Sequence, residues 1–170
     1  MNNSRHLPGG GKPLLYLDFD GVLHPENAVR TRRYGPMLSG YPGHHLFENV
    51  SRLAIALGPY PDVRLVLSTS WVLVYGYDRA RKRLGPLAPR VIGATYHTKM
   101  SLDRFLALPR GVQVLGDVGR RNPSSWIALD DDDEGWPATW RSNLVHTDDR
   151  FGLVEPAVWS ELQRKLAVLR

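Results

Sequence analysis

The amino-acid sequence predicts a single α/β domain with a central parallel sheet. Three observations support this fold class. Short apolar runs alternate with segments of helical periodicity, several runs stop abruptly at polar residues, and 170 residues suit one hydrophobic core but not two ordinary domains. A continuous apolar run that stops at polar residues is typical of a buried parallel strand, because helices cover such a strand on both faces.

Each expected strand is a short apolar run, and each expected helix repeats apolar residues every three or four positions. The expected strands are Leu14–Leu17, Val63–Leu67, Arg90–Gly93, Trp126–Leu129 and Leu144–His146. The expected helices are His44–Leu57, Asp78–Leu84, Gly111–Arg120 and Pro156–Leu169. Between the first strand and the first helix, the glycines and prolines of Val22–Tyr41 predict an irregular, flap-like loop.

Composition excludes several classes of protein. The chain has no cysteine, which excludes a disulfide scaffold, thiol catalysis and a cysteine-type zinc site. Its apolar runs are too short to span a membrane, and the N-terminus lacks the apolar core of a signal peptide, so we expect a cytoplasmic protein with no membrane partner. Residues 1–11 end in a Pro-Gly-Gly-Gly run and are expected to be a flexible lead-in to one domain over residues 12–170. The sequence does not indicate an oligomeric state.

The charge balance favours anionic partners. The net charge is +5 and the pI is about 9.7, which attracts phosphate esters or nucleic acid. A solvated basic surface without a specific partner explains the same balance equally well. Arg30, Arg32 and Arg33 lie in the flap-like loop, either as contacts for a polyanion near the site or as ordinary surface charge.

Polar residues follow three of the expected strands at the point where each strand ends. Asp18 and Asp20 follow the first strand, Ser68–Ser70 the second, and Asp130 and Asp131 the fourth. Ligands of open parallel sheets bind at this carboxyl edge. Crowded carboxylates repel one another and need a cation, and oxygen ligands beside a phosphate favour Mg²⁺. The sequence therefore predicts a magnesium site formed by these four aspartates.

The same residues suit phosphoryl transfer. Asp18 can attack phosphorus and form an aspartyl-phosphate, which divides one difficult displacement into two easier ones. Asp20 can protonate the leaving oxygen and later accept a proton from water. Gly21 allows a sharp backbone turn, and Gly21, Thr69 and Ser70 are the candidates for contact with the substrate. A Lys or Arg should add positive charge at the transition state.

Two of the three motifs have a simpler interpretation. Asp18–Gly21 has the composition of a turn, although Val29 stands where a calcium loop would need a bidentate glutamate. Ser68–Ser70 can cap the segment that follows it. The order of three motifs behind three apolar strands favours the catalytic reading of both.

These motifs resemble those of a known family. Leu15–Leu23 (LYLDFDGVL) resembles the first motif of the haloacid dehalogenase-like (HAD) superfamily, Leu65–Trp71 its second and Trp126–Asp131 its fourth. Together with Val91–Thr95 and Gly152–Leu153, the motifs are similar to a compact branch named for its occurrence in Swiss Army Knife RNA repair proteins. The resemblance spans residues 13–169.

The resemblance implies a three-layer Rossmann-like HAD fold with a minimal, capless insert. It implies that Asp18 is the nucleophile and a Mg²⁺ ligand, and that Asp20 is the acid/base and binds the metal through its backbone carbonyl. Thr69 would hold the phosphoryl group, and Asp130 and Asp131 would complete the metal site. An aspartate two places after the nucleophile resembles phosphatases more than dehalogenases.

The third motif of the family is a Lys or Arg near the start of the helix before the fourth strand. Arg110 fits best, because the expected helix Gly111–Arg120 leads toward Trp126, and Lys99 is the second candidate.

We therefore expect phosphomonoester hydrolysis, with a nucleic-acid or nucleotide terminus as the phosphorylated substrate and RNA repair as its setting. The segments between motifs are too short for a cap domain, and open sites in the family resemble those that act on large substrates. Two alternatives stay open. One is a small-metabolite phosphatase whose flap closes over the substrate, and the other is a non-catalytic module that binds nucleic acid or a protein partner.

Overall fold

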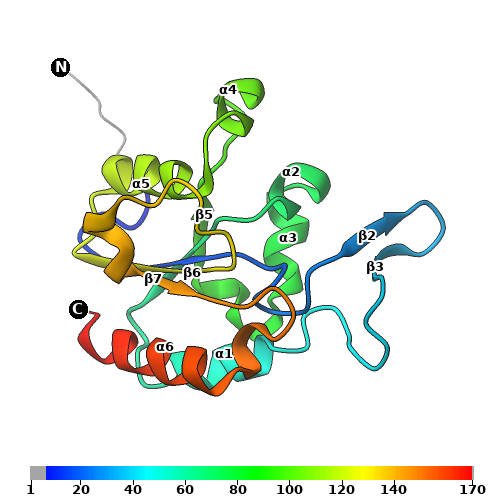
Figure 1. Cartoon of the computed structure of the whole chain (residues 1–170). Coiled ribbons are helices and arrows are strands. Elements are labelled where there is room, and N and C mark those ends of the chain that lie inside the picture. Colours follow the sequence, from blue (N-terminus) through cyan, green and yellow to red (C-terminus); the bar gives the residue numbers. More distant parts are fainter. Residues whose placement is uncertain (1–6, 170) are drawn as a thin grey trace.

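The computed structural model describes residues 7–169, which fold around a five-stranded parallel sheet (Figure 1). The order of the strands across the sheet is β5-β4-β1-β6-β7. Their bounds are β1 Pro13–Leu17, β4 Arg64–Leu67, β5 Val91–Ala94, β6 Ser125–Asp130 and β7 Leu144–His146. The α/β class and all five expected strands are confirmed, each with ends within one residue of the expected ones.

The first strand lies in the middle of the sheet. Leu15 in β1 pairs with Leu65 in β4 on one side and with Ile127 in β6 on the other. Every residue of β1 is buried. This burial explains the uninterrupted apolar run, because a central strand covered on both faces has no side chain in contact with water.

Alternate side chains of β1 pack into two separate layers. Leu15 and Leu17 pack with the helices α1 and α6, and α3 belongs to the same apolar cluster. Leu14 and Tyr16 point to the opposite face, where Val114 of α5 packs on them. The bounds of these helices are α1 Val50–Leu57, α3 Tyr77–Arg83, α5 Arg110–Arg121 and α6 Pro156–Val168. The sheet between two helical layers is the expected three-layer arrangement (Figure 1).

Five short helical segments were not expected from the sequence. They are α2 Trp71–Tyr75, α4 Leu102–Leu106 and the 3₁₀ turns η1 Gly85–Arg90, η2 Ala138–Asn143 and η3 Gly152–Val154. A segment of three to six residues completes too few turns to produce an apolar periodicity, so sequence patterns do not reveal it.

The expected helix over His44–Leu57 is wrong for its first six residues, because α1 begins only at Val50. Phe47 has a φ of +62°, outside the helical region, and its backbone N–H donates to Nδ1 of His24 at 3.2 Å. The backbone N–H of Asn49 donates to the Leu23 carbonyl at 2.9 Å. These contacts with the loop after β1 replace the hydrogen bonds of a helix.

The expectation that Val22–Tyr41 is irregular throughout is also wrong. The segment contains an antiparallel hairpin of β2 Ala28–Thr31 and β3 Gly35–Leu38, which projects from one side of the sheet (Figure 1). The Thr31 hydroxyl closes its turn by donating to the Gly35 carbonyl at 2.9 Å and accepting from the Tyr34 N–H at 3.0 Å. The hairpin is too small for a cap domain, which agrees with the expected minimal insert.

The first described residues are attached to the end of α5. The Arg121 guanidinium donates to the Pro8 carbonyl at 2.7 Å, and the Gly11 N–H donates to the Asn122 carbonyl at 3.0 Å. Residues 1–6 of the expected flexible lead-in lie outside the described residues. Within residues 7–169, no helix combines the length and the apolar character needed to cross a membrane.

Candidate active site

The predicted site residues lie together at the carboxyl edge of the sheet. Asp18 follows β1 directly and Asp20 stands two positions later. Thr69 follows β4, while Asp130 is the last residue of β6 and Asp131 comes next. Because β4, β1 and β6 are neighbouring parallel strands, their ends bring side chains from three distant segments to one place.

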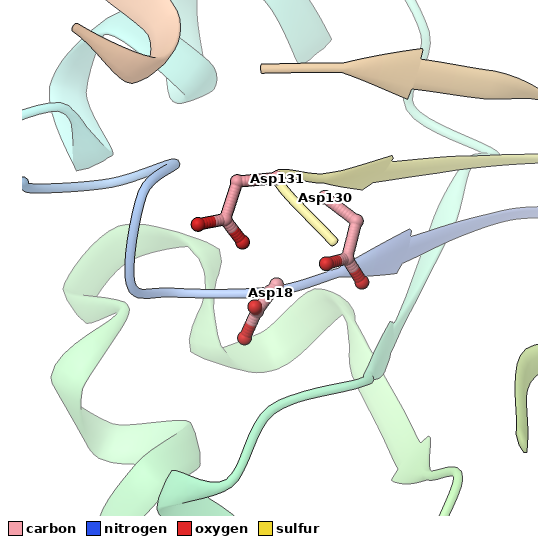
Figure 2. A group of neighbouring side chains, drawn as sticks. All are labelled: Asp18, Asp130 and Asp131. Carbon is pink, nitrogen blue, oxygen red and sulfur yellow. The ribbon is translucent and has the colours of Figure 1, made fainter. Parts of the chain in front are cut away.

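Three of the four aspartates form a compact carboxylate group (Figure 2). One oxygen from each of Asp18, Asp130 and Asp131 lies within 4.8 Å of the other two. Asp18 and Asp130 are buried, and Asp131 is partly exposed. Among the described residues, Oδ2 of Asp130 is a buried acceptor without a hydrogen-bond donor. A set of hard oxygen ligands in which one buried oxygen accepts no hydrogen bond fits a divalent cation such as Mg²⁺.

Gly21 makes room for this group. A Cβ atom at Gly21 would lie 2.2 Å from Oδ2 of Asp131, and the backbone φ of +66° is one that other residues rarely adopt. The Thr147 hydroxyl donates to the Gly21 carbonyl at 2.8 Å and fixes the turn. The structure thus places Gly21 against the third carboxylate, and the contact with substrate stays a prediction.

The three carboxyls have pKa values above their ordinary range, and burial is the main cause for each. Burial raises the pKa of Asp18, although Arg110 opposes the shift. Burial and the charge of Asp18 raise the pKa of Asp130 well above its usual value. Burial, Asp18 and then Glu26 raise the pKa of Asp131 to about 7. A bound cation would remove this mutual repulsion.

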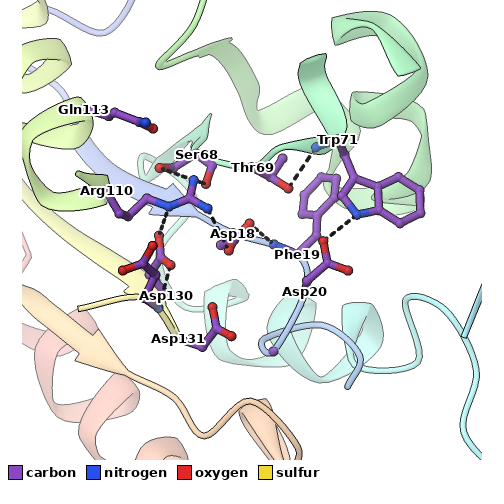
Figure 3. Close-up of polar contacts among 12 residues, drawn as sticks. Asp18, Phe19, Asp20, Ser68, Thr69, Trp71, Arg110, Gln113, Asp130 and Asp131 are labelled. Atoms are coloured by element: carbon purple, nitrogen blue, oxygen red, sulfur yellow. Dashed lines mark hydrogen bonds and ion pairs between the residues drawn. The ribbon is translucent and has the colours of Figure 1, made fainter. Parts of the chain in front are cut away.

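Arg110 supplies a cation on the other side of the group (Figure 3). Arg110 is the first residue of α5, and its guanidinium lies 3.3 Å from Asp18 Oδ2. It also forms an ion pair with Asp130 Oδ2 at 3.4 Å, a distance too long for a good hydrogen bond. Its guanidinium also donates to the Ser68 carbonyl. Burial alone would lower the pKa of Arg110, but Asp18 and Asp130 outweigh it and raise that pKa. Lys99, the other candidate, is exposed and lines a different cavity.

The side chain of Asp20 lies outside the carboxylate group. Trp71 Nε1 donates to its Oδ2 at 2.8 Å, and His24 Nε2 lies 3.1 Å from its Oδ1. Since the Phe47 N–H donates to Nδ1 of His24, the ring hydrogen is on Nε2, and His24 is a second donor to Asp20. Two N–H donors therefore fix this carboxylate. A metal contact through its backbone carbonyl stays a prediction.

Sequence reasoning missed these two donors. Trp71 follows the hydroxyl motif directly, and His24 stands four residues after Asp20. The spacing was visible, but most Trp side chains pack in cores, and the sequence had no signal that an indole N–H would face a carboxylate.

The hydroxyl motif has both predicted and simpler roles. The oxygen of the buried Thr69 hydroxyl accepts from the Trp71 backbone N–H at 3.4 Å. The same hydroxyl lies near Asp18 and opposes the rise in the pKa of that carboxyl. Ser70 is exposed, and its side chain makes no capping hydrogen bond to α2. Thr69 therefore stabilises the turn and lies beside Asp18 at the same time.

A cavity of about 600 Å³ opens over the carboxylates. It is lined by Asp18, Asp20, Glu26, Asn27, Ala28, Ser70, Arg110, Asp131, Asp132 and Asp149. Arg110 is the single cation in this lining. A neighbouring cavity of about 250 Å³ shares Ser70, Arg110 and Asp132 and extends to α4. The geometry thus places a buried carboxylate, a carboxylate group that could hold a cation, a fixed guanidinium and an oriented second carboxylate around one open space.

Comparison with known proteins gives one family. The family model described as the HAD domain in Swiss Army Knife RNA repair proteins matches residues 14–158, which include all the aspartates of the site and Arg110. Neither the curated proteins nor the solved structures contain a significant match.

Proposed function

We propose that the chain is a Mg²⁺-dependent phosphomonoester hydrolase that acts through an aspartyl-phosphate. The proposal starts from its family, because the chain belongs to the HAD domains in Swiss Army Knife RNA repair proteins. Membership of the HAD family makes it a hydrolase of the phosphatase type. The proposed substrate is a phosphorylated nucleic-acid or nucleotide terminus, and the proposed setting is RNA repair.

One observation carries the proposal. Asp18, at the end of the central strand, shares a group of carboxylate oxygens within 4.8 Å with Asp130 and Asp131, and Arg110 lies 3.3 Å from its other side. A buried carboxylate between a cation site and a guanidinium is placed to remain ionised as an anionic phosphate approaches.

In the first step, an oxygen of Asp18 attacks phosphorus and the bond from phosphorus to the leaving oxygen breaks. Asp20, fixed by Trp71 and His24, gives its proton to that oxygen. The Arg110 guanidinium and the Thr69 hydroxyl stabilise the charge that develops on the phosphoryl oxygens. Mg²⁺ held by Asp18, Asp130 and Asp131 would add Lewis-acid charge at the same oxygens.

In the second step, water attacks phosphorus of the aspartyl-phosphate and Asp20 accepts its proton. The bond between phosphorus and Asp18 breaks, which releases inorganic phosphate and restores both carboxyl groups to their starting states. The openness of the cavity supports a large substrate, because the hairpin is the only insert between β1 and α1 and does not form a cap.

Turnover assays separate the proposed function from its alternatives. We expect Mg²⁺-dependent release of phosphate from p-nitrophenyl phosphate and, with higher kcat/KM, from a 3′-phosphorylated oligonucleotide. A chelator should abolish both. Preference for small phosphorylated metabolites over the oligonucleotide would favour the metabolite phosphatase. Oligonucleotide binding without turnover of any phosphoester would favour the non-catalytic module.

A further inference from the structure

Positive charge is concentrated in two segments beside the candidate active site. The hairpin, residues 28–38, contains three arginines and no acid. Helix α3, residues 77–83, contains four cations and one acid. These segments together have a net charge of +6, whereas the whole chain has +5, so the rest of the chain is slightly negative. The basic pI is therefore a local property of this part of the molecule.

The two segments form one surface. The Arg30 guanidinium of the hairpin lies 5.8 Å from the centre of the Tyr75 ring, and Arg83 lies 6.0 Å from the Trp71 ring. A depression of about 240 Å³ there is lined by Trp71, Tyr75, Arg79, Lys82 and Arg83. We call the set Arg30, Tyr75, Arg79, Lys82 and Arg83 the basic face.

The basic face is connected to the reacting centre through one side chain. Trp71 contacts Arg83 with its ring and donates from Nε1 to Asp20 at 2.8 Å. The basic face therefore begins directly behind the carboxylate proposed as the acid. Ala28, the first residue of the hairpin, and Ser70, which directly precedes α2, both line the cavity over the carboxylates, so the hairpin and α2 begin at its edge.

The electrostatics of the cavity itself make such a surface necessary. Its lining has six carboxylates and one cation, Arg110. With Mg²⁺ bound, this set suits one phosphate, but further phosphates of a polyanion would be repelled by the exposed acids of the lining, Glu26 and Asp149. The affinity for the remaining phosphates has to come from outside the cavity.

The hairpin also carries an exposed aromatic group. Tyr34, at its turn, is 68% exposed, and the Arg33 guanidinium lies 5.3 Å from the centre of its ring. A ring and a guanidinium open to solvent suit stacking with a nucleobase. Trp71 is buried and Tyr75 is half-buried, so these two rings are not available for stacking with a nucleobase. They position the neighbouring cations instead.

We propose that the basic face binds the sugar-phosphate backbone of a single-stranded polynucleotide whose terminal phosphate occupies the catalytic cavity. The inference rests on the proposed function and names the surface that selects its substrate. An acidic phosphoprotein would also satisfy the cations, but it has no base to stack on Tyr34, so the observations favour the polynucleotide.

Binding measurements with an inactive protein test the surface. Both variants are made in an Asp18→Asn background, and the test variant is R79E/K82E. The control is K12E/R164E, which makes the same charge change at two other exposed positions, one directly before β1 and one on α6. The probe is a fluorescent, 3′-phosphorylated single-stranded oligonucleotide. We expect R79E/K82E to raise its Kd at least about tenfold at low salt, and K12E/R164E to raise it less than about twofold.

The salt dependence of Kd, a charge-neutralising variant and the melting temperatures show whether a loss of binding comes from lost phosphate contacts or from misfolding. Loss of two phosphate contacts should reduce the slope of log Kd against log salt by about 1.4. The neutral pair R79Q/K82Q should give an intermediate Kd, and each variant's melting temperature shows whether it is folded. In the active protein, R79E/K82E should lower kcat/KM for the oligonucleotide relative to p-nitrophenyl phosphate by a similar factor.

Three results would overturn the inference: an unchanged Kd in folded R79E/K82E or R79Q/K82Q, an equal loss in K12E/R164E, or tighter binding of an acidic phosphopeptide than of the oligonucleotide. These results differ from failure of the proposed function. That failure would appear as absence of Mg²⁺-dependent turnover of p-nitrophenyl phosphate, with the oligonucleotide still bound through Arg79 and Lys82.

Discussion

At the scale of single residues, the environment of Asp20 has a direct chemical consequence. An acid must point at the leaving oxygen, and here the Trp71 indole and the His24 imidazole determine where the carboxylate points. Neither side chain belongs to the carboxylate group of Asp18, Asp130 and Asp131 that could hold a metal ion. In the proposed mechanism they are positioning residues, which act on the reaction through Asp20.

Replacement of Trp71 by Phe should therefore affect substrates unequally. An alkyl phosphate needs its leaving oxygen protonated, whereas p-nitrophenolate leaves without help. We expect W71F to lower kcat/KM roughly tenfold more for glycerol phosphate than for p-nitrophenyl phosphate. The control is Trp140→Phe, a substitution of a half-exposed ring that packs on Trp126. Equal losses on both substrates would show that Trp71 only supports the core.

Arg110 is the second residue whose replacement is informative. Loss of its charge leaves Asp18 and Asp130 facing one another without the guanidinium, so R110Q should lower kcat by about 10²-fold or more. R110K keeps a positive charge but loses the guanidinium N–H that donates to the Ser68 carbonyl. It should therefore have a kcat between those of R110Q and the wild type. Arg104→Gln, at an exposed position on α4, is the control. A fully active R110Q would remove Arg110 from the mechanism.

At the scale of elements, the turn after β1 determines how closely the carboxylates at the end of β6 approach Asp18. Gly21→Ala would place a Cβ 2.2 Å from Asp131 in a backbone of positive φ. Gly35→Ala in the hairpin has a similar φ of +73° and no heavy atom within 4 Å of the added Cβ, so it reports backbone strain alone, about 1 kcal/mol. We expect G21A to cost more stability than G35A and to weaken Mg²⁺ affinity, measured by calorimetric titration. The same Mg²⁺ affinity in both variants would contradict this role.

The sequence predicts the elements of the site better than the contacts between them. All five strands were predicted, because a central parallel strand such as β1 needs a continuous apolar run. The hairpin and the late start of α1 were missed, since both depend on tertiary hydrogen bonds such as that from Phe47 to His24. Asp18, Asp130 and Asp131 were placed together by the rule for strand ends, whereas the partners of Asp20 required coordinates.

At the scale of the whole molecule, the carboxylates oppose folding when no cation is present. The pKa of Asp131 is about 7 in the folded protein and 3.8 ordinarily, so the folded state holds a proton that the unfolded state releases. The resulting stabilisation is complete below about pH 4 and is lost as the pH rises through about 7. We therefore expect the melting temperature of the metal-free protein to fall over that range, and to fall less in Asp131→Asn.

Mg²⁺ should reverse the effect. In the proposed site it would bind the ionised carboxylates of the folded state, so it should raise the melting temperature more at about pH 8 than at about pH 5. Asp133, whose pKa is lowered by its contact with Arg141 on the surface, provides the control, and Asp133→Asn should leave the Mg²⁺ shift unchanged. A Mg²⁺-induced rise in melting temperature that is the same at both pH values would show that these acids do not bind the metal.

The central claim is that Asp18 carries the phosphoryl group between two chemical steps. Rapid acid quenching after mixing with a radiolabelled phosphomonoester and Mg²⁺, followed by peptide mapping, tests it directly. We predict label on Asp18, more of it in Asp20→Asn because hydrolysis of the intermediate slows, and none in Asp18→Asn, which should also lack turnover. Label on another residue, or normal turnover by Asp18→Asn, would contradict the account.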